Sequence, residues 1–479
     1  MTTIVWFRQD LRLADNPALF EAAAKGPVLP VFILEDPERS GERHPMGGAS
    51  NWWLHHSLKA LAKSLGGLLL LRGDARVAIP ALAHETGATA VHWNRCYEPH
   101  AVERDTEIKA ELKQQGIEVN SYNASLLHEP WELETKSGGP FKVYSPFWRA
   151  ALQEPVADPL PRPEKLVIAD LPNTGEQIDD LDLLPRSPNW AEGWEDLWQP
   201  GEEGAMKRLQ DFLADGLEGY GELRNRPDLP NVSRLSPHLH FGEISPRQIR
   251  HETNSVEDAE PALKKDGAKF ISEIGWREFS YHLLYHFPTL PHDNFKPSFD
   301  AYPWRASETD LRAWQRGETG YPIVDAGMRE LWKTGYMHNR VRMIVASFLV
   351  KHLRLDWRHG EAWFRDTLVD ADLANNSASW QWVAGSGADA APYFRIFNPM
   401  SQGAKFDPDG AYVRQWVPEL AGLDDAYIHA PFDAPDKALI KAGVTLGKTY
   451  PHPIVEHFAA RDAALEGYEA VKRGGEAAA

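Results

Sequence analysis

Residues 270–279 read FISEIGWREF and bring three chemically different side chains onto one predicted helix face. Glu273, Trp276 and Arg277 are spaced three and four residues apart, and residues at that spacing are neighbours on an α-helix. An acid, a ring and a base together could hold a flat ligand with polar edges. A solvated ion pair beside a core tryptophan is the plainer interpretation, so this candidate site needs support from other segments.

A second polar helix face is predicted for the segment 337–343, which reads MHNRVRM. Asn339, Arg342 and Met343 share this face, and it lies opposite an apolar stripe. The stripe consists of Val341, Ile344, Val345, Phe348 and Leu349. This helix therefore has one face for a core and one face for polar contacts.

Two further short segments are unusually rich in polar residues. Residues 370–377, DADLANNS, hold two acids and two amides, which disfavour a helix unless they serve a ligand or a cap. A helix start capped by Asp370 or Asp372 is the alternative. Residues 232–237, VSRLSP, could bind a phosphate through hydroxyls and backbone N–H groups. Ordinary capping by Ser236, with Pro237 in the first turn, is the favoured interpretation of that segment taken alone.

The end of the first predicted strand also carries charges. Residues 6–12 read WFRQDLR and are followed by Asp15 and Asn16, where a dinucleotide-binding fold would place a glycine-rich turn. The chain contains no GxGxxG motif, so NAD is not expected here. A ligand at the carboxyl end of the sheet and plain salt bridges are equally good interpretations of these charges.

The elements that must position these groups follow from the hydrophobic pattern. Short apolar segments alternate with helical patterns over the first 120 residues, which predicts a parallel sheet covered by helices on both faces. Right-handed crossovers make this a doubly wound domain. The predicted strands are 4–7, 28–34, 68–72, 88–93 and 117–120, and the helices between them are 17–25, 50–65, 77–85 and 100–115.

The pattern changes after this region. Residues 155–200 are rich in Pro, Asp and Trp and have little periodicity, which is typical of a connector. Beyond them the pattern is helical; for example, Ala205, Leu209 and Phe212 belong to one apolar stripe. We therefore predict an α/β domain over residues 1–130, a connector over 131–200 and an all-α domain over 201–479.

Composition restricts the class of protein. The formal net charge is -18, so any contact with nucleic acid must come from a local basic site. The single cysteine, Cys96, excludes a disulfide framework and favours a reducing, cytoplasmic compartment. No Cys/His cluster has the spacing of a metal site, and no apolar segment is long enough to predict a membrane span. The 18 tryptophans could be core residues, stacking platforms or redox relays.

Taken together, these segments resemble the photolyase/cryptochrome family, and most closely the bacterial class I photolyases that act on cyclobutane pyrimidine dimers. The resemblance covers nearly the whole chain. It rests on the ordered motifs WFRQDLR with Asp15-Asn16, SRLSP at 233–237, WREF at 276–279, TGYPIVDA at 319–326 and WQW at 380–382.

The resemblance implies that the helical domain binds FAD. In that case Arg342 pairs with Asp370, Asp372 lies near the flavin ring and Asn375 faces flavin N5. The implied FAD-binding residues are Tyr220, Ser233, Arg234, Leu235, Ser236, Phe270, Arg277, Arg342, Asp370, Asp372 and Asn375.

The resemblance also implies a substrate, DNA that contains pyrimidine dimers. Excited, reduced FAD would pass an electron to the flipped-out dimer and recover it after the ring opens. The implied catalytic residues are Glu273, Asn339, Met343 and Asn375, and the implied DNA-binding residues are Arg224, Glu273, Trp276, Asn339, Arg340, Trp382 and Gln402. Trp380, Trp357 and Trp304 match the relay that reduces resting flavin in light. The resemblance thus implies the activity of a deoxyribodipyrimidine photo-lyase. The protein is then expected to be a cytoplasmic monomer that associates with the nucleoid on binding DNA.

Two rival functions share the flavin. A cryptochrome sensor would not repair DNA, but plant sensors usually have Asp in place of Asn375. A (6-4) photolyase needs histidine acid catalysis where this chain has Asn339 and Met343.

A second, antenna chromophore is also implied, and its identity is open. The folate-binding Asn-Glu pair of some relatives is replaced by His100-Ala101. Methenyltetrahydrofolate, a deazaflavin, a second flavin and an empty site remain the alternatives.

Overall fold

The computed structural model describes residues 2–37, 44–390 and 394–477. The chain groups into two compact units. Unit 1 consists of Met1–Glu218, Ser233–Pro288 and Val369–Ala374, and unit 2 consists of Gly219–Val232, Thr289–Leu368 and Asn375–Ala479. Two later segments, 233–288 and 369–374, therefore belong to the same unit as the N-terminal residues.

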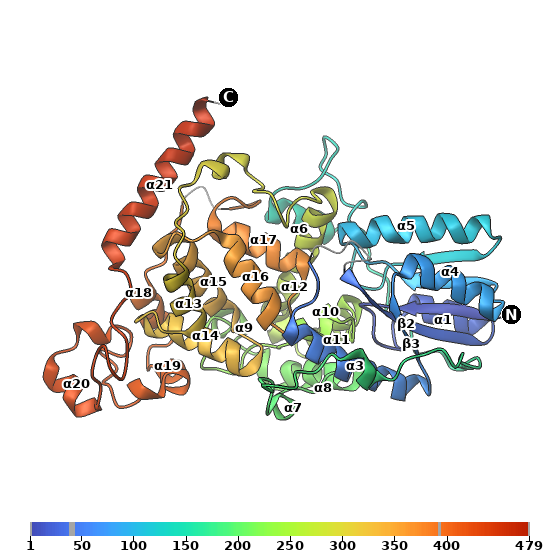
Figure 1. Ribbon diagram of the computed structural model, residues 1–479, viewed down its shortest axis with the longest axis horizontal. Helices are drawn as coiled ribbons and strands as arrows, with labels where there is room; N and C mark the ends of the chain where they lie inside the picture. Colours follow the sequence, from blue (N-terminus) through green and yellow to red (C-terminus); the bar gives the residue numbers. More distant parts are fainter. Residues whose placement is uncertain (1, 38–43, 391–393, 478–479) are drawn as a thin grey trace. The chain divides into compact units, whose positions relative to one another are not determined.

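A five-stranded parallel sheet forms the N-terminal part of unit 1, in the order β3-β2-β1-β4-β5. Its strands are β1 (Thr3–Phe7), β2 (Val28–Glu35), β3 (Leu69–Gly73), β4 (Ala90–Asn94) and β5 (Glu118–Tyr122). The helices between them are α1 (Pro17–Lys25), α3 (Gly48–Leu65), α4 (Ala75–Thr86) and α5 (Pro99–Gln114) (Figure 1). The predicted doubly wound α/β fold is confirmed, and the predicted strands and helices differ from the observed ones by one or two residues at their ends.

The sheet is buried because helices pack on it. Ile4 and Trp6 of β1 share one hydrophobic cluster with Ile79 of α4 and Ile108 of α5. Helix α1 packs against β1 and β4. Its start is set locally, because the Asn16 side chain caps the helix by accepting from the Leu19 N–H at 3.1 Å. All five residues of β1 are buried, as expected for a central parallel strand.

The connector has little regular structure, but it packs into the core of unit 1. Its first part contains helix α6 (Tyr144–Ala151), and residues 155–200 contain only η1 (Ile178–Leu181), α7 (Trp194–Leu197) and a parallel bridge between Ile168 and Val28. The ring centroid of Trp194 lies 5.3 Å from that of Trp52 of α3, and those of Trp198 and Trp53 are also 5.3 Å apart. Edge-to-face packing of this kind makes these tryptophans core residues.

The rest of the chain is helical. In unit 1 the remaining helices are α6 (Tyr144–Ala151), α8 (Glu202–Asp211), η2 (Phe212–Gly216), α10 (Ser236–His240), α11 (Pro246–Ala259), η3 (Pro261–Leu263) and α12 (Lys264–His286). In unit 2 they are α9 (Tyr220–Leu223), η4 (Pro297–Ala301), α13 (Glu308–Arg316), α14 (Pro322–Thr334), α15 (Asn339–Ser347), η5 (Phe348–His352), α16 (Trp357–Thr367), α18 (Pro399–Phe406), α19 (Ala411–Trp416), η6 (Pro418–Leu420), η7 (Pro431–Asp433), α20 (Asp436–Ala442) and α21 (His457–Ala477). Helix α17 (Leu373–Ala384) begins in unit 1 and continues in unit 2.

The apolar stripe predicted for residues 341–349 is buried, and it runs from α15 into the π-helical turn η5. None of the helices in the described ranges combines the length and the apolar composition that a membrane span requires.

Candidate functional site

The charged residues that follow β1 are structural. Arg12 is fully buried and donates to the carbonyls of Gly242 at 2.8 Å and Ala124 at 2.7 Å. Asp15 is also fully buried, pairs with Arg247 at 2.8 Å and accepts from the Ser245 hydroxyl. These contacts hold the segment 242–247 against the end of β1. Of the two interpretations offered for these charges, the salt-bridge interpretation is therefore right for Asp15, whereas Arg12 is held by backbone carbonyls.

Gly242 allows this close approach. It has φ +63°, and a Cβ atom there would lie 2.0 Å from the Gln9 carbonyl oxygen. Only glycine has room at this position and adopts this backbone conformation without strain.

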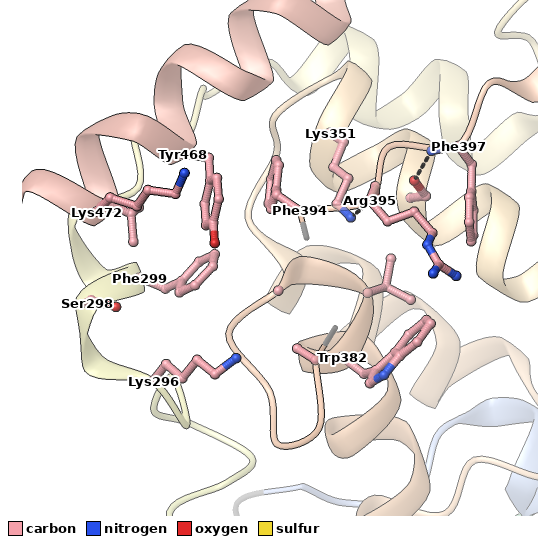
Figure 2. Close-up of a pocket in the computed structure, with 15 residues that line it drawn as sticks. Lys296, Ser298, Phe299, Lys351, Trp382, Phe394, Arg395, Phe397, Tyr468 and Lys472 are labelled. Atoms are coloured by element: carbon pink, nitrogen blue, oxygen red, sulfur yellow. Dashed lines mark hydrogen bonds between the residues drawn. The ribbon is translucent and has the colours of Figure 1, made fainter. Parts of the chain in front are cut away.

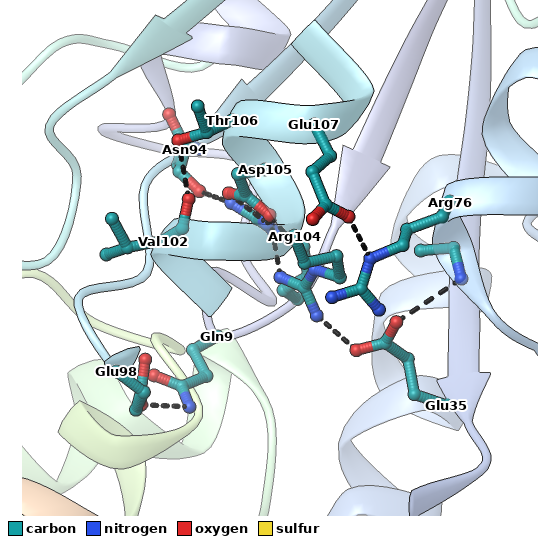
Figure 3. Close-up of polar contacts among 12 residues, drawn as sticks. Gln9, Glu35, Arg76, Asn94, Glu98, Val102, Arg104, Asp105, Thr106 and Glu107 are labelled. Atoms are coloured by element: carbon teal, nitrogen blue, oxygen red, sulfur yellow. Dashed lines mark hydrogen bonds and ion pairs between the residues drawn. The ribbon is translucent and has the colours of Figure 1, made fainter. Parts of the chain in front are cut away.

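A second charged cluster lies at the carboxyl end of the sheet (Figure 3). Asp105 pairs with Arg8 and Arg104, both at 2.8 Å, and Arg104 also pairs with Glu35. Although burial opposes it, the two guanidinium groups hold the pKa of Asp105 below its usual range. Gln9 donates to Oε1 of Glu98 at 2.9 Å.

Two buried polar atoms at this end of the sheet have no hydrogen-bond partner among the described residues, Oε2 of Glu98 and Nε of Arg8. They are the atoms that a polar ligand at this edge would use. The edge of the sheet where α/β proteins bind ligands is therefore polar and incompletely paired.

Ser236 does not cap helix α10. Leu235 occupies the cap position without a side-chain bond, and the Ser236 hydroxyl donates to Asp370 at 2.5 Å. The capping interpretation is therefore wrong, because a carboxylate from a distant segment accepts the hydroxyl proton instead. The contact brings together two of the predicted cofactor residues within unit 1.

Two buried polar residues, Tyr281 and His240, lie beside Asp372, which directly precedes helix α17. The Tyr281 hydroxyl donates to its carboxylate, and Nδ1 of His240 lies 4.0 Å from Oδ2. Burial lowers the pKa of His240, so its ring is neutral at pH 7. Neither ring nitrogen of His240 has a hydrogen-bond partner among the described residues. An unsatisfied buried imidazole beside a carboxylate fits a site that a polar cofactor completes.

Arg277 lies on the same side of helix α12 as Tyr281, one helical turn earlier. Its guanidinium lies 4.8 Å from the centroid of the Tyr281 ring and donates to the Ser125 carbonyl at 2.6 Å. Sequence reasoning missed His240 and Tyr281. The available signal was their spacing, four residues after Ser236 and after Arg277, respectively.

Glu273 and Trp276 lie on another part of α12. Lys269 pairs with Glu273 at 2.6 Å, so the acid is held by the preceding helical turn. The Tyr144 ring stacks on Trp276 with centroids 3.7 Å apart and planes 10° apart. The Tyr144 hydroxyl donates to the Ser272 carbonyl at 2.6 Å. Trp276 is thus a rigid aromatic platform, half-buried and one helical turn from a carboxylate.

Phe270 lies on the same helix as this platform, but it faces the core. It is buried, and its ring centroid lies 4.6 Å from that of Phe212.

In unit 2, the predicted DNA-binding residue Arg340 contacts the predicted catalytic residue Met343 and two residues that were not predicted, Asn225 and Phe406. Its guanidinium donates to Oδ1 of Asn225 at 2.6 Å and lies 4.5 Å from the centroid of the Phe406 ring. It also approaches the sulfur of Met343 at 3.5 Å. Gln402 lies one helical turn before Phe406 on α18, so the structure brings Arg340, Met343 and Gln402 into one neighbourhood.

Arg224 and Arg342 make separate contacts in unit 2. Arg224 lies 5.7 Å from the centroid of Tyr220, and Nε of Arg342 donates to the Met337 carbonyl at 2.7 Å. Asn375 is half-buried on α17, whereas its neighbour Asn376 is bonded to Glu361. The predicted pairing of Arg342 with Asp370 stays a prediction.

The three predicted relay tryptophans all belong to unit 2. Trp380 packs edge-on against Phe364 of α16, with ring centroids 5.0 Å apart. It also lies against Gly360 of α16, where a Cβ atom would come within 2.1 Å of the indole. Trp357 is three residues before Gly360 on this helix and donates to Asn294 at 3.0 Å. Helix α16 therefore connects Trp380 to Trp357.

Trp304 is tied to the same region through the backbone. The N–H of Arg305 donates to the carbonyl of Arg354 at 2.7 Å, one helical turn before Trp357. The Trp304 ring lies 4.4 Å from the Tyr302 ring.

Across the described ranges, no three His, Cys, Asp or Glu side chains converge as a metal ion would require. The polar groups found here suit an organic cofactor with phosphate and ring atoms.

Known protein families match both the N-terminal and the C-terminal part of the chain. The family model described as DNA photolyase matches residues 3–164, and the model described as the FAD binding domain of DNA photolyase matches residues 270–470. A deoxyribodipyrimidine photo-lyase of Agrobacterium fabrum is 55% identical over 477 residues, which covers 98% of each chain. Cryptochrome-1 of Arabidopsis thaliana is 39% identical, and the match covers 95% of this chain and 68% of that protein.

A solved structure has nearly the same fold. The crystal structure of a bacterial class III photolyase from Agrobacterium tumefaciens superposes with a TM-score of 0.95 at 54% identity, and the match covers 98% of each chain. The chain therefore belongs to the photolyase/cryptochrome family and contains the FAD-binding domain of that family.

Proposed function

We propose that this protein repairs cyclobutane pyrimidine dimers in DNA with the energy of blue or near-ultraviolet light. The observation that carries the proposal is the pairing of an aromatic platform with a carboxylate on α12, where Tyr144 stacks behind Trp276 and Glu273 lies one turn away. A flipped-out pair of bases needs a ring face for stacking and an acceptor for its polar edge. A dinucleotide or sugar site would not require this combination.

The residues around Asp372 would hold FAD. When bound and reduced, FAD supplies an electron on excitation. The Ser236–Asp370 contact fixes a hydroxyl and a carboxylate beside the left-handed turn at Arg234, where backbone donors suit a pyrophosphate. His240 stays neutral through burial and adds no charge. Asn375 supplies an amide where plant sensors usually have an acid, so it adds no negative charge near the ring.

The first test is light-dependent repair by the FAD-loaded, reduced protein. Oligothymidylate irradiated with ultraviolet light should regain thymine absorbance in blue light and not in darkness.

The second candidate function, a cryptochrome-type sensor, is favoured by the 39% identity to a plant cryptochrome. FAD binding without restored absorbance on dimer-containing DNA would favour the sensor, or a photolyase for (6-4) lesions.

Glu273→Ala is expected to lose repair yield and dimer selectivity while FAD stays bound. A hydrogen bond to a charged group is worth about 1.5–3 kcal/mol, so affinity for dimer DNA should fall about tenfold or more. Repair yield and binding of irradiated oligothymidylate measure the effect. Glu260→Ala, which removes an exposed acid from the same unit, is the matched control. Unchanged repair in Glu273→Ala would remove this residue from the mechanism.

Tyr144→Leu is expected to weaken the platform, because the leucine cannot stack on Trp276. The loss of an aromatic pair costs about 0.5–1.5 kcal/mol beyond buried area, which predicts a several-fold lower affinity for dimer DNA. Tyr144→Phe keeps the stack and loses only the bond to Ser272, so it separates the ring from the hydroxyl. Equal affinities in both variants would contradict a stacking role.

The expectations about an antenna chromophore, the oligomeric state and the cellular location are separate from the proposal of dimer repair. The partly unpaired edge of the sheet, with Glu98 and Arg8, is compatible with a polar antenna chromophore, and its identity stays a prediction. A monomeric state, a cytoplasmic location and association with the nucleoid also stay predictions.

A further inference from the structure

A cavity of about 200 Å³ in unit 2 combines positive charge with aromatic walls. It is lined by residues of η4, α15, η5, α17 and α21, together with described residues that follow α17, such as Gly385 and Phe394. Of the residues assigned a role above, only Trp382 lines it. We call it the lysine pocket, and its main lining residues are Lys296, Phe299, Lys351, Phe394, Tyr468 and Lys472.

Lys351 is the buried cation of this pocket. Its side chain projects from the π-helical turn η5, is 4% exposed and donates to the carbonyl of Arg395. Its ammonium also lies 4.6 Å from the centroid of Phe394. In the described part of the chain no carboxylate lies within ion-pair distance of it. Burial without a counter-ion disfavours the charged form of Lys351, so an anion bound beside it would stabilise the ammonium.

Other cationic side chains near Lys351 add to the positive charge of the pocket. Lys296 and Arg395 also line the pocket, and Figure 2 shows that these two residues and Lys351 come from different segments. Lys472 is partly balanced, because it pairs with Glu469 at 2.7 Å. Asp389 attracts the charge of Lys296 but is not a lining residue. The pocket therefore carries more cations than acids.

One wall of the pocket is built from stacked rings. Phe394 and Tyr468 have centroids 4.7 Å apart and planes 8° apart, and the Phe299 centroid lies 6.1 Å from that of Tyr468. Lysines lie over the outer faces of this pair, Lys351 over Phe394 at 4.6 Å and Lys472 over Tyr468 at 4.8 Å. Because the Lys472 side chain is exposed, a planar ligand with a phosphate could displace it and stack on Tyr468.

We propose that the lysine pocket binds a nucleotide, with its phosphate held by Lys351, Lys296 and Arg395 and its base on the outer face of Tyr468. Lysine and arginine neutralise phosphate, and bases of any sequence stack on aromatic faces. The nucleotide could come from the free pool or from a DNA strand, and the two sources present the same chemistry. Dimer repair as derived above does not require this site.

The test is calorimetric titration of the FAD-loaded full chain with thymidine 5′-monophosphate, thymidine, inorganic phosphate and undamaged oligothymidylate. The monophosphate should bind more tightly than thymidine or phosphate alone. Lys351→Met and Lys296→Gln should each weaken it about tenfold, because each removes a charge-assisted hydrogen bond. Lys437→Gln makes the same charge change at an exposed position on α20 and should have no effect. Lys296 is only half-buried, so its variant tests the pocket even if Lys351→Met folds poorly.

Proton uptake gives an independent readout. Burial and the charge of Arg395 lower the pKa of Lys351 to about 7, and an arriving phosphate should raise it again. The other groups that face Lys351 do not titrate near pH 8 as imidazoles, because burial lowers the pKa of His352 to about 3 and also lowers that of His457. Binding at pH 8 should therefore take up protons, as seen by calorimetry in buffers of different ionisation enthalpy, and Lys351→Met should abolish this uptake.

The two sources give different results. Binding of the free monophosphate that depends on Lys296 identifies a mononucleotide site. If only oligothymidylate binds, and Lys296→Gln weakens it, the occupant is a nucleotide of a DNA strand. If neither ligand depends on Lys296 or Lys351, the proposal is wrong, whatever the outcome of the dimer-repair assay.

Discussion

Asp15→Ala is expected to destabilise the folded protein by about 3–5 kcal/mol, the cost of removing one partner from a buried ion pair. The substitution leaves the Arg247 guanidinium without its partner at 2.8 Å and leaves the backbone N–H of Leu160 without its acceptor at 3.0 Å. The Ser245 hydroxyl loses its acceptor as well. Urea unfolding followed by tryptophan fluorescence measures the loss.

Two further variants isolate the cause. Asp15 has φ 49°, a conformation that asparagine tolerates better than alanine, so Asp15→Asn tests the charge without the backbone strain. Asp158→Ala removes an exposed acid whose nearest cation, His251, is 3.8 Å away, and such exposed pairs contribute about 0–1 kcal/mol. Stability equal to the parent protein in both Asp15 variants would show that this network does not hold the segment 242–247 to the sheet.

Gly360→Ala is expected to displace Trp380 and to slow light-driven reduction of oxidised FAD. The new Cβ atom would lie 2.1 Å, 2.4 Å and 2.6 Å from three carbons of the indole. The ring has little room to move, because Phe364 and Trp314 pack against it at centroid distances of 5.0 Å and 6.2 Å. Overpacking of this kind costs about 1–3 kcal/mol and moves side chains away from their preferred positions.

The readout separates packing from electron transfer. Photoreduction is measured by the loss of oxidised flavin absorbance in blue light, and repair is measured with chemically reduced protein. Gly360→Ala should lose the first and keep the second. Trp304→Phe should give the same split while keeping an aromatic ring beside Tyr302, and normal photoreduction in that variant would remove Trp304 from the relay. Gly422→Ala, where the nearest atoms lie 3.3–3.7 Å from the new Cβ, is the matched control.

Local signals predicted the secondary structure well. Helix α1 begins after Asn16 and ends before Gly26, as the cap, the proline and the apolar spacing indicate. The strands could be predicted because each is a short apolar segment between turn residues, and five of them alternate with helices. The connector could be predicted from composition, but the packing of Trp194 on Trp52 could not, since nothing in either segment indicates its partner.

The candidate site was predictable only where its residues share a helix turn. The i, i+3 and i+4 spacing placed Glu273, Trp276 and Arg277 together on α12. The same spacing suggested an ion pair of Glu273 with Arg277, whereas Lys269 is the closer partner of Glu273, at 2.6 Å. Tyr144, which stiffens the platform, comes from a helix more than a hundred residues earlier.

By itself, the sequence determined the fold class, the family and the FAD-binding domain, because ordered motifs and hydrophobic periodicity are properties of neighbouring residues. Only the tertiary structure decided what the individual polar side chains do. Arg12 bonds to a carbonyl 230 residues away, and the Ser236 hydroxyl bonds to an acid 134 residues away, so neither role is visible locally. The lysine pocket depends on packing in the same way, since its lining residues extend from Lys296 to Lys472 and are brought together only by folding.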